Sequence, residues 1–205
     1  MKLQYLFILL VFNFLVVINT FAMVPPPGPN DQVTFVQGLS AQKQERNQWC
    51  WAATSRMLLS AKIPNLQSQC EIVSNVLGHD CCTYSSLSCN RPYNLEIALN
   101  KLGHAVTKGY PKEDPTQHWT NRIDYKGWYQ SVVTAIKEGS PVAIAKLNAS
   151  GTTDASSHVV VAFGTYRKAN QDYLIIYDSI DGKKKFWDRS YVVGNQAWIV
   201  TYTIE

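Results

Sequence analysis

After its first 22 residues the sequence has no further long apolar run, and its surplus of positive charge is small. Lysine and arginine number 19 against 15 acidic residues, which gives a formal net charge of +4. So mild a surplus argues against nucleic acid as the main partner, because nucleic-acid-binding domains gather basic charge to neutralise phosphates. A membrane span needs about 20 apolar residues, so the later part of the chain offers no segment that would cross a bilayer.

Charged residues are also sparse, at 17%, and internal repeats are absent. Hydrophobic residues make up 46% and aromatic residues 12%, which is the composition of a chain with a buried core. These values exclude a disordered, collagen-like or coiled-coil protein. For 205 residues of this composition we expect one domain.

The start of the chain has the pattern of a secretory signal peptide. Met1 and Lys2 form a short positive start, the apolar run Leu6–Ile18 follows, and Thr20 and Ala22 supply the small residues of a cleavage site. An uncleaved anchor is the alternative, but the run is shorter than the ~20 residues that span a bilayer. We therefore expect residues 1–22 to be removed and the mature protein to be secreted or periplasmic, without stable membrane insertion. Disulfides persist in such compartments.

Residues 23–41 are expected to form an extended, proline-rich leader, and residues 42–205 the folded domain. Helical patterns dominate the first half of this domain and strand patterns the second half, which predicts an α+β fold. The expected helices span Cys50–Ala61, Leu66–Leu77, Tyr93–Leu102 and Trp128–Glu138, and the expected strands span Val33–Gln37, Pro141–Leu147, His158–Tyr166, Tyr173–Asp178, Lys184–Asp188 and Ala197–Ile204.

An odd number of cysteines predicts that one thiol stays unpaired in an exported protein. Cys50 stands apart, whereas Cys70, Cys81, Cys82 and Cys89 lie within a short segment. A bond between Cys81 and Cys82 is disfavoured, because the Cα atoms of neighbours lie only ~3.8 Å apart. Two pairings stay open, namely Cys70–Cys81 with Cys82–Cys89, or Cys70–Cys82 with Cys81–Cys89.

Several other polar features are expected to be structural or solvated. A zinc site made by the four clustered cysteines and His79 is a rival interpretation, but the spacing matches no common zinc finger and the compartment favours oxidation. His104 and His118 adjoin no apolar strand with a partner carboxylate. Lys183–Lys185 is expected to be the solvated face of a hairpin. The single glycosylation sequon begins at Asn148.

Cys50 is the residue best placed for chemistry. It opens an expected helix for which Asn47 is a plausible cap. The positive end of a helix favours a thiolate, and the free N–H groups of the first turn can stabilise an oxyanion. The alternative is a buried structural cysteine between two core tryptophans, Trp49 and Trp51.

A thiolate nucleophile needs a base, and the base needs a group that orients it. His158 opens one strand and Asp178 closes the next, so the two lie at the same edge of an expected hairpin. If Tyr166 pairs with Tyr173, His158 lies opposite position 181. A one-residue slip would exchange the faces of the two side chains, so the register decides whether they meet.

Gln44, six residues before the run Trp49-Cys50-Trp51-Ala52-Ala53, resembles the active-site signature of papain-like cysteine peptidases. The resemblance is closer still to a short branch, common in bacteria, that includes secreted effector proteases and lies near the leader-cleaving peptidases of bacteriocin exporters. It extends from Gln44 to the end of the chain, in the order Gln, Cys, His, Asp. It implies a two-lobed papain-like fold, in which Gln44 and the Cys50 backbone N–H form the oxyanion hole.

The chain also departs from the larger plant and lysosomal papains. Those enzymes carry a cysteine where this chain has Asn47, and an asparagine closely followed by tryptophan where it has Asp178. They also carry a long inhibitory pro-segment, for which Met23–Ala41 is the only obvious covalent counterpart here. Their disulfide map therefore does not transfer.

The sequence thus predicts an exported cysteine peptidase with Cys50, His158 and Asp178 as catalytic triad and Gln44 as oxyanion donor. It would need no metal or cofactor, act as a monomer, and bind protein or peptide substrates rather than nucleic acid. Two alternatives stay open. One is a related acyl-transfer enzyme, namely a peptidoglycan hydrolase, deamidase or transglutaminase; the other is an inactive, disulfide-stapled binding module.

Overall fold

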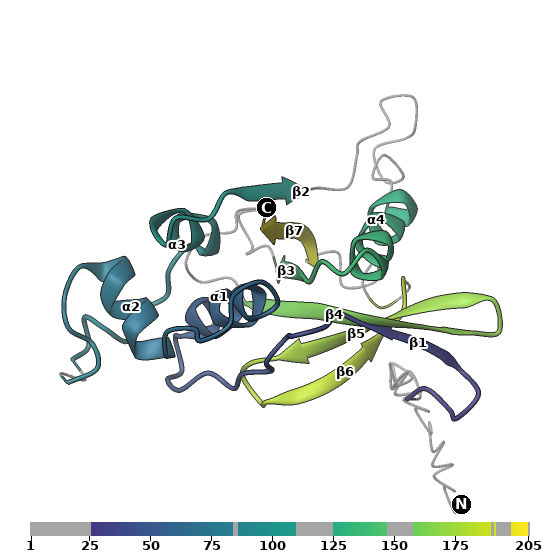
Figure 1. Ribbon diagram of the computed structural model, residues 1–205, viewed down its shortest axis with the longest axis horizontal. Helices are drawn as coiled ribbons and strands as arrows, with labels where there is room; N and C mark the ends of the chain where they lie inside the picture. Colours follow the sequence, from purple (N-terminus) through teal and green to yellow (C-terminus); the bar gives the residue numbers. More distant parts are fainter. Residues whose placement is uncertain are drawn as a thin grey trace, which may run out of the picture.

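The computed structural model describes residues 26–83, 86–109, 125–146, 158–189, 191 and 198–204. The expected signal peptide, His118 and the sequon at Asn148 lie outside these residues. The elements, drawn in Figure 1, are β1 (Gln32–Phe35), α1 (Cys50–Ser60), α2 (Gln69–Leu77), α3 (Leu95–Lys101), β2 (Val106–Gly109), α4 (Tyr125–Lys137), β3 (Val142–Lys146), β4 (Val159–Lys168), β5 (Gln171–Asp178), β6 (Lys183–Trp187) and β7 (Trp198–Ile204). None of the helices in this described part is long and apolar enough to cross a bilayer.

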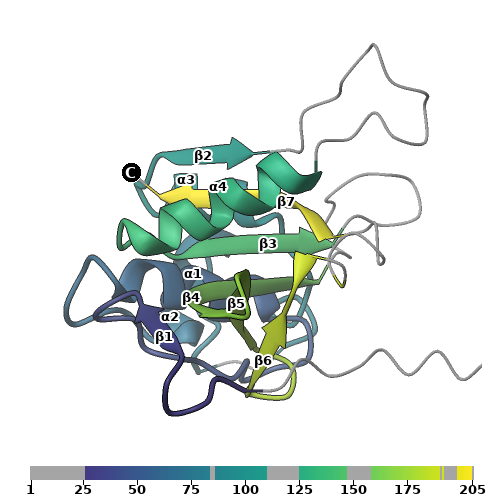
Figure 2. The same ribbon diagram turned by 90° about the vertical axis from the view of Figure 1, so that its right-hand side faces the viewer.

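The strands form one seven-stranded antiparallel sheet in the order β2-β7-β3-β4-β5-β6 (Figure 2). β1 pairs with the far half of β4, on the edge that β3 leaves free. The strand expected at Val33–Gln37 is therefore present as β1, and it brings part of the segment 23–41 into the sheet. β2 was not anticipated from the sequence, because its four residues show no clear alternation.

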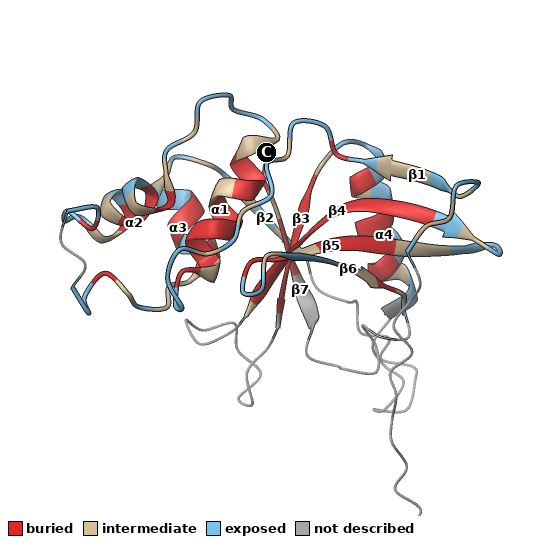
Figure 3. Cartoon of the chain, turned by 90° about the horizontal axis from the view of Figure 1, so that it is seen from below, coloured by how far each residue is buried: buried red, intermediate tan, exposed pale blue. Residues whose placement is uncertain are grey.

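Helices cover both faces of the sheet. α1, α2 and α3 lie together on one side and α4 on the other (Figure 3). Successive side chains of a strand point to opposite faces of the sheet, so each central strand contributes apolar residues to the helices on both sides. Val160 and Ile176 pack in the cluster beneath α4, whereas Val161 and Ile175 pack in the cluster beneath α1 and α3.

The helix ends differ in part from those expected. Asn47 does not cap α1, because Trp49 occupies the N-cap position without a side-chain cap bond and Asn47 instead accepts a hydrogen bond from Asn90. α2 begins later than expected, at a capping box in which Ser68 and Glu71 bond each other's backbone. It ends at Gly78 with φ of 78°, a left-handed cap that glycine adopts without strain.

Two disulfides close the loop after α2. They join Cys70 to Cys82 and Cys81 to Cys89, which is the second of the two pairings that the sequence left open. Cys81 and Cys89 are buried in a small apolar cluster that includes Trp49. The crosslinked loop therefore packs against the segment that leads into α1.

The β4–β5 hairpin contains an irregularity that matters for the site. Tyr166 pairs with Tyr173 as expected, but the register shifts between Ala162 and Gly164, so that Val161 pairs with Tyr177. Phe163 is thus the extra residue of a β-bulge. The strand accordingly changes face there, since Ala162 packs beneath α4 whereas Tyr166 packs in the opposite cluster.

β1 is joined to this bulge. The Val36 N–H donates to the Phe163 carbonyl at 2.9 Å, and the ring of Phe35 crosses directly over Gly164. A Cβ added at Gly164 would lie 2.7 Å from that ring, so only glycine leaves room for the crossing. The bulge and β1 therefore stabilise one another.

Candidate active site

Cys50 is the first residue of α1 and carries the free thiol among the five cysteines, all of which lie in the described residues. It is partly exposed, while its neighbours Trp49 and Trp51 are each 1% exposed. The Trp49 indole N–H donates to the Cys89 carbonyl at 2.8 Å, and that of Trp51 to the Arg91 carbonyl at 3.1 Å. The two tryptophans thus anchor the backbone on either side of Cys50, which itself stays partly exposed.

His158 and Asp178 meet at the open end of the β4–β5 hairpin. His158 Nε2 lies 2.8 Å from Asp178 Oδ1. The bulge at Phe163 makes this contact possible, because extending the register beyond it sets His158 opposite position 180 rather than 181. Residues two apart on a strand share a face, so Asp178 then lies on the same face as His158. A regular hairpin would have turned them to opposite faces.

His158 also hydrogen-bonds the Cys50 side chain. The structure therefore brings the three residues proposed from the sequence into one chain of contacts, from the thiol through the imidazole to the carboxyl group. Burial opposes the charged imidazole, but the hydrogen bonds and charges of Asp178 and Cys50 outweigh it and raise the pKa of His158 to about 9. The imidazole is thus held protonated at neutral pH between two acceptors.

Asp178 is 7% exposed and still ionised. Burial alone would raise its pKa, but the hydrogen bonds from His158 and Lys185 and the Ile180 N–H hold the pKa of Asp178 far below its usual range. Lys185 Nζ lies 2.6 Å from Asp178 Oδ2. The carboxylate is therefore shared between an imidazole and an ammonium group.

The expectation that Lys183–Lys185 form a solvated face is wrong for Lys185, which contacts Asp178. Asp178 pairs with Lys183 in the register of β5 and β6, so Lys185 lies diagonally across from Asp178 on the same face. Lys183 and Lys184 are exposed, as expected. The sequence alone does not show that Lys185 lies beside Asp178, because this depends on how β6 pairs with β5. Sequence reasoning therefore missed Lys185.

Gln44 joins the two halves of the molecule. Its backbone N–H donates to the Ser179 carbonyl at 2.9 Å, and the Ser179 hydroxyl donates to Gln44 Oε1 at 3.3 Å. Its amide nitrogen donates to the Arg46 carbonyl at 2.9 Å, which engages one of its two hydrogens. The side chain is thereby fixed beside the residue that follows Asp178.

Gln69 is a second glutamine that the sequence did not single out. It is 1% exposed on α2, donates to the Lys43 carbonyl at 2.7 Å and accepts from the Glu45 N–H at 3.1 Å. These two bonds bracket Gln44 and hold its backbone in place. A buried polar residue in an otherwise apolar helix face was the available signal.

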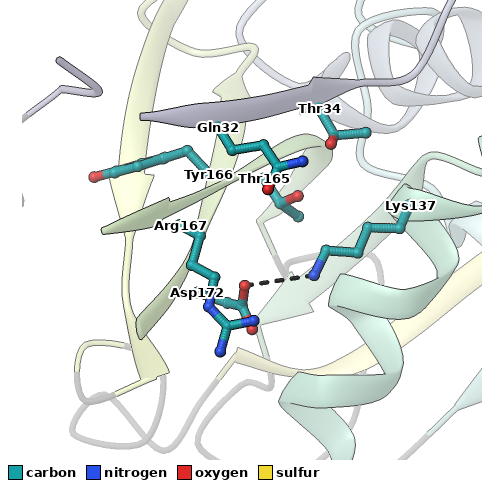
Figure 4. A pocket seen from close by; sticks show the side chains of 7 residues that line it. All are labelled: Gln32, Thr34, Lys137, Thr165, Tyr166, Arg167 and Asp172. Carbon is teal, nitrogen blue, oxygen red and sulfur yellow. Dashed lines mark hydrogen bonds and ion pairs between the residues drawn. The ribbon is translucent and has the colours of Figure 1, made fainter. Parts of the chain in front are cut away.

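Other clusters of polar groups are already satisfied. A cavity of about 250 Å³ lies at the turn end of the β4–β5 hairpin, where the Lys137 and Asp172 side chains that line it form an ion pair at 3.5 Å (Figure 4). Within the described residues, the one group with metal-ligand proximity is His79 with Cys81 and Cys89. Both sulfurs are in a disulfide, so they offer no thiolates to a metal.

Comparison with known proteins places this arrangement in a family. Residues 36–202, which include all four candidate site residues, match the model of the Peptidase_C39 like family. Digestive procathepsin L 3 from the larval midgut of Tenebrio molitor has a TM-score of 0.53 at 13% identity, over 88% of this chain and 72% of that chain. A chain from structural work on antibody cross-reactivity between the mite allergens Blo t 1 and Der p 1 has a TM-score of 0.49 at 17% identity, over 92% and 74%.

No curated protein sequence is significantly similar to the chain. The α+β, papain-like fold expected from the sequence is confirmed by the antiparallel sheet, the helices that cover it and the cathepsin comparison.

Proposed function

Because the chain belongs to the Peptidase_C39 like family, we propose that it is an exported cysteine peptidase that hydrolyses peptide bonds. The observation that carries this proposal is the contact chain in which His158 bonds both the Cys50 side chain and Asp178. Nucleophile, base and orienting group within hydrogen-bond reach are the signature of covalent acyl transfer.

In the proposed reaction the Cys50 thiolate attacks the peptide carbonyl, paired with the His158 imidazolium. The imidazolium then protonates the leaving amine, and neutral His158 activates the water that hydrolyses the thioester. Asp178 keeps the ring oriented through its 2.8 Å bond to Nε2, which leaves Nδ1 for the sulfur. The ring therefore serves first as acid and then as base without turning.

The oxyanion would be bound by the Cys50 backbone N–H and the Gln44 amide. The first turn of a helix leaves N–H groups without partners in the helix, and Cys50 begins α1. The Gln44 amide nitrogen keeps a second hydrogen beside the one donated to Arg46. Loss of one such donor typically reduces the rate on the order of a hundredfold.

Export is part of the proposal. The two disulfides favour an oxidising compartment, and the signal-like first 22 residues supply a route to it. In the same compartment Cys50 has no thiol partner, because the other four cysteines are paired.

Hydrolysis of casein tests the proposal. Cys50→Ala should abolish cleavage and keep the thermal unfolding midpoint near that of the unaltered protein, because Cys50 is partly exposed and forms no disulfide. His158→Ala should also abolish cleavage, but with a lower midpoint, because it removes the 2.8 Å partner of Asp178. His104→Ala is the matched histidine control and should retain activity. Cleavage by the Cys50→Ala protein would overturn the proposal. If the unaltered protein does not cleave casein but acts on peptidoglycan or on an amine donor, one of the related acyl-transfer reactions is assigned instead.

A further inference from the structure

The carboxylate of Asp178 has three partners on its two oxygens. Oδ1 lies 2.8 Å from His158 Nε2 and accepts from the Ile180 N–H at 3.1 Å. Oδ2 lies 2.6 Å from Lys185 Nζ, a short contact typical of a charge-assisted bond. Lys185 in turn lies 3.1 Å from Asp181. Each oxygen therefore faces a different positive group.

These contacts define the charged surroundings of the imidazole among the described residues. From α1, His158 faces Cys50; from β5, it faces Asp178. Asp178 faces His158 and, from β6, Lys185. Lys185 faces Asp178 and, from the β5–β6 turn, Asp181. The side chains of Cys50, His158, Asp178 and Lys185 thus form one continuous chain of contacts.

We propose that Lys185 is a positioning residue of the active site, which anchors Oδ2 of Asp178 and opposes the charge that Asp178 presents to His158. The inference rests on the proposed function. It assigns a role to Lys185, which is not one of the four site residues predicted from the sequence.

The argument is electrostatic. A lone carboxylate in a partly buried site would stabilise an imidazolium strongly, and an imidazolium that holds its proton too tightly is a poor acid. Lys185 lies on the far oxygen, so it weakens the field of Asp178 at His158 without displacing the hydrogen bond. It also leaves Asp178 one low-energy orientation, because both oxygens are engaged.

The chain supplies a matched control. Lys183 lies directly opposite Asp178 in the register, on the same face of β6 as Lys185, but it is exposed. Its charge is therefore screened by water, whereas that of Lys185 acts through a direct contact. Lys183→Met and Lys185→Met remove the same charge from the same strand.

The test is a pH titration of His158 by NMR of the full chain with labelled histidine, with the resonance assigned by its loss in His158→Gln. In Lys185→Met the titration midpoint should rise by about one pH unit, and in Lys183→Met it should stay unchanged. Lys185→Arg should restore the original midpoint. An unchanged or lowered midpoint in Lys185→Met would overturn the inference.

Lys185→Gln guards against a folding defect, because its amide still donates to Asp178 Oδ2 while the charge is gone. It should raise the midpoint as Lys185→Met does; an unchanged midpoint would also overturn the inference. The alkaline limb of casein hydrolysis should move with the NMR midpoint. If substitution of Lys185 shifts the His158 midpoint but the unaltered protein hydrolyses no casein, the proposed peptidase function is refuted. The inference that Lys185 controls the pKa of His158 then still holds.

Discussion

The helical lobe, made of α1 to α3 and the loop they enclose, and the sheet lobe, made of the seven strands and α4, are stabilised in different ways. The helical lobe holds both disulfides around a small cluster that includes Trp49 and Trp51. The sheet lobe has no cysteine among its described residues. It depends on the apolar cluster beneath α4, on a second cluster that it shares with α1 and α3, and on strands paired across long sequence distances. A lobe with little apolar area to bury gains most from crosslinks.

The comparison extends to the active site. Cys50 comes from the crosslinked helical lobe, where anchored tryptophans fix the backbone. His158 and Asp178 come from one hairpin of the sheet lobe, where a bulge fixes their faces. Each lobe thus positions its own candidate catalytic groups by its own means, and we expect that the two can be disturbed separately.

The largest effect should come from the sheet lobe. Insertion of one alanine between His158 and Val159 moves His158 from the position opposite residue 180 to the position opposite residue 181, so His158 and Asp178 would point to opposite faces. Hydrolysis of casein should fall by roughly 10³-fold or more, as when a triad loses its orienting group. Phe163→Leu keeps the residue count and should retain most activity. Equal activity of the two variants, measured per folded molecule, would show that the register of His158 against Asp178 does not set the site.

In the helical lobe, removal of the Cys81–Cys89 crosslink should lower stability without altering the sheet. The bond closes a sequence separation of 8 residues, so Cys81→Ala with Cys89→Ala should cost about 2–3 kcal/mol in urea unfolding. Hydrogen exchange should quicken first in α2, while β4 and β5 stay protected. Cys50→Ala is the control, with little expected change. A loss of protection spread evenly over both lobes would contradict the separation drawn here.

The contact between the lobes should depend on pH. Since the pKa of His158 is raised to about 9, raising the pH from 8 to 10 should reduce hydrolysis by about tenfold as the imidazolium is lost. The folded pKa of His158 also exceeds its unfolded value of about 6.5, so its contribution to stability is full below that pH and is lost as the pH rises through 9. A flat rate profile between pH 8 and 10 would contradict this assignment.

The smallest effect should come from a helix cap. Ser68→Ala removes the side-chain half of the α2 capping box and should cost about 1 kcal/mol in urea unfolding. Ser131→Ala in α4 is the control from the sheet lobe, where an exposed serine bonds only the carbonyl of Gly127 one turn back. It should change stability by less than about 0.5 kcal/mol. Equal losses at both positions would remove the distinction between a cap and an interior serine.

The sequence predicted the fold class, most elements within a few residues and the side chains that meet at the site. It did not predict the bulge at Phe163, because that irregularity depends on β1, a strand far away in the chain that bonds the Phe163 carbonyl. Lys185 was missed for a related reason, since its partner is set by the β5–β6 register. Gln69 and the cap of α1 likewise depend on tertiary contacts that local propensity does not encode.

The bond between the Gln44 N–H and the Ser179 carbonyl ties the segment before Cys50 to the end of β5. Separation of the two lobes at this point would break this bond and would also part the Cys50 thiol from the His158 imidazole, because these two residues lie on different lobes. A peptidase of this design would lack its contact between Cys50 and His158 until both lobes had folded and joined. A proteolytic enzyme built this way would be spared self-digestion while it matures.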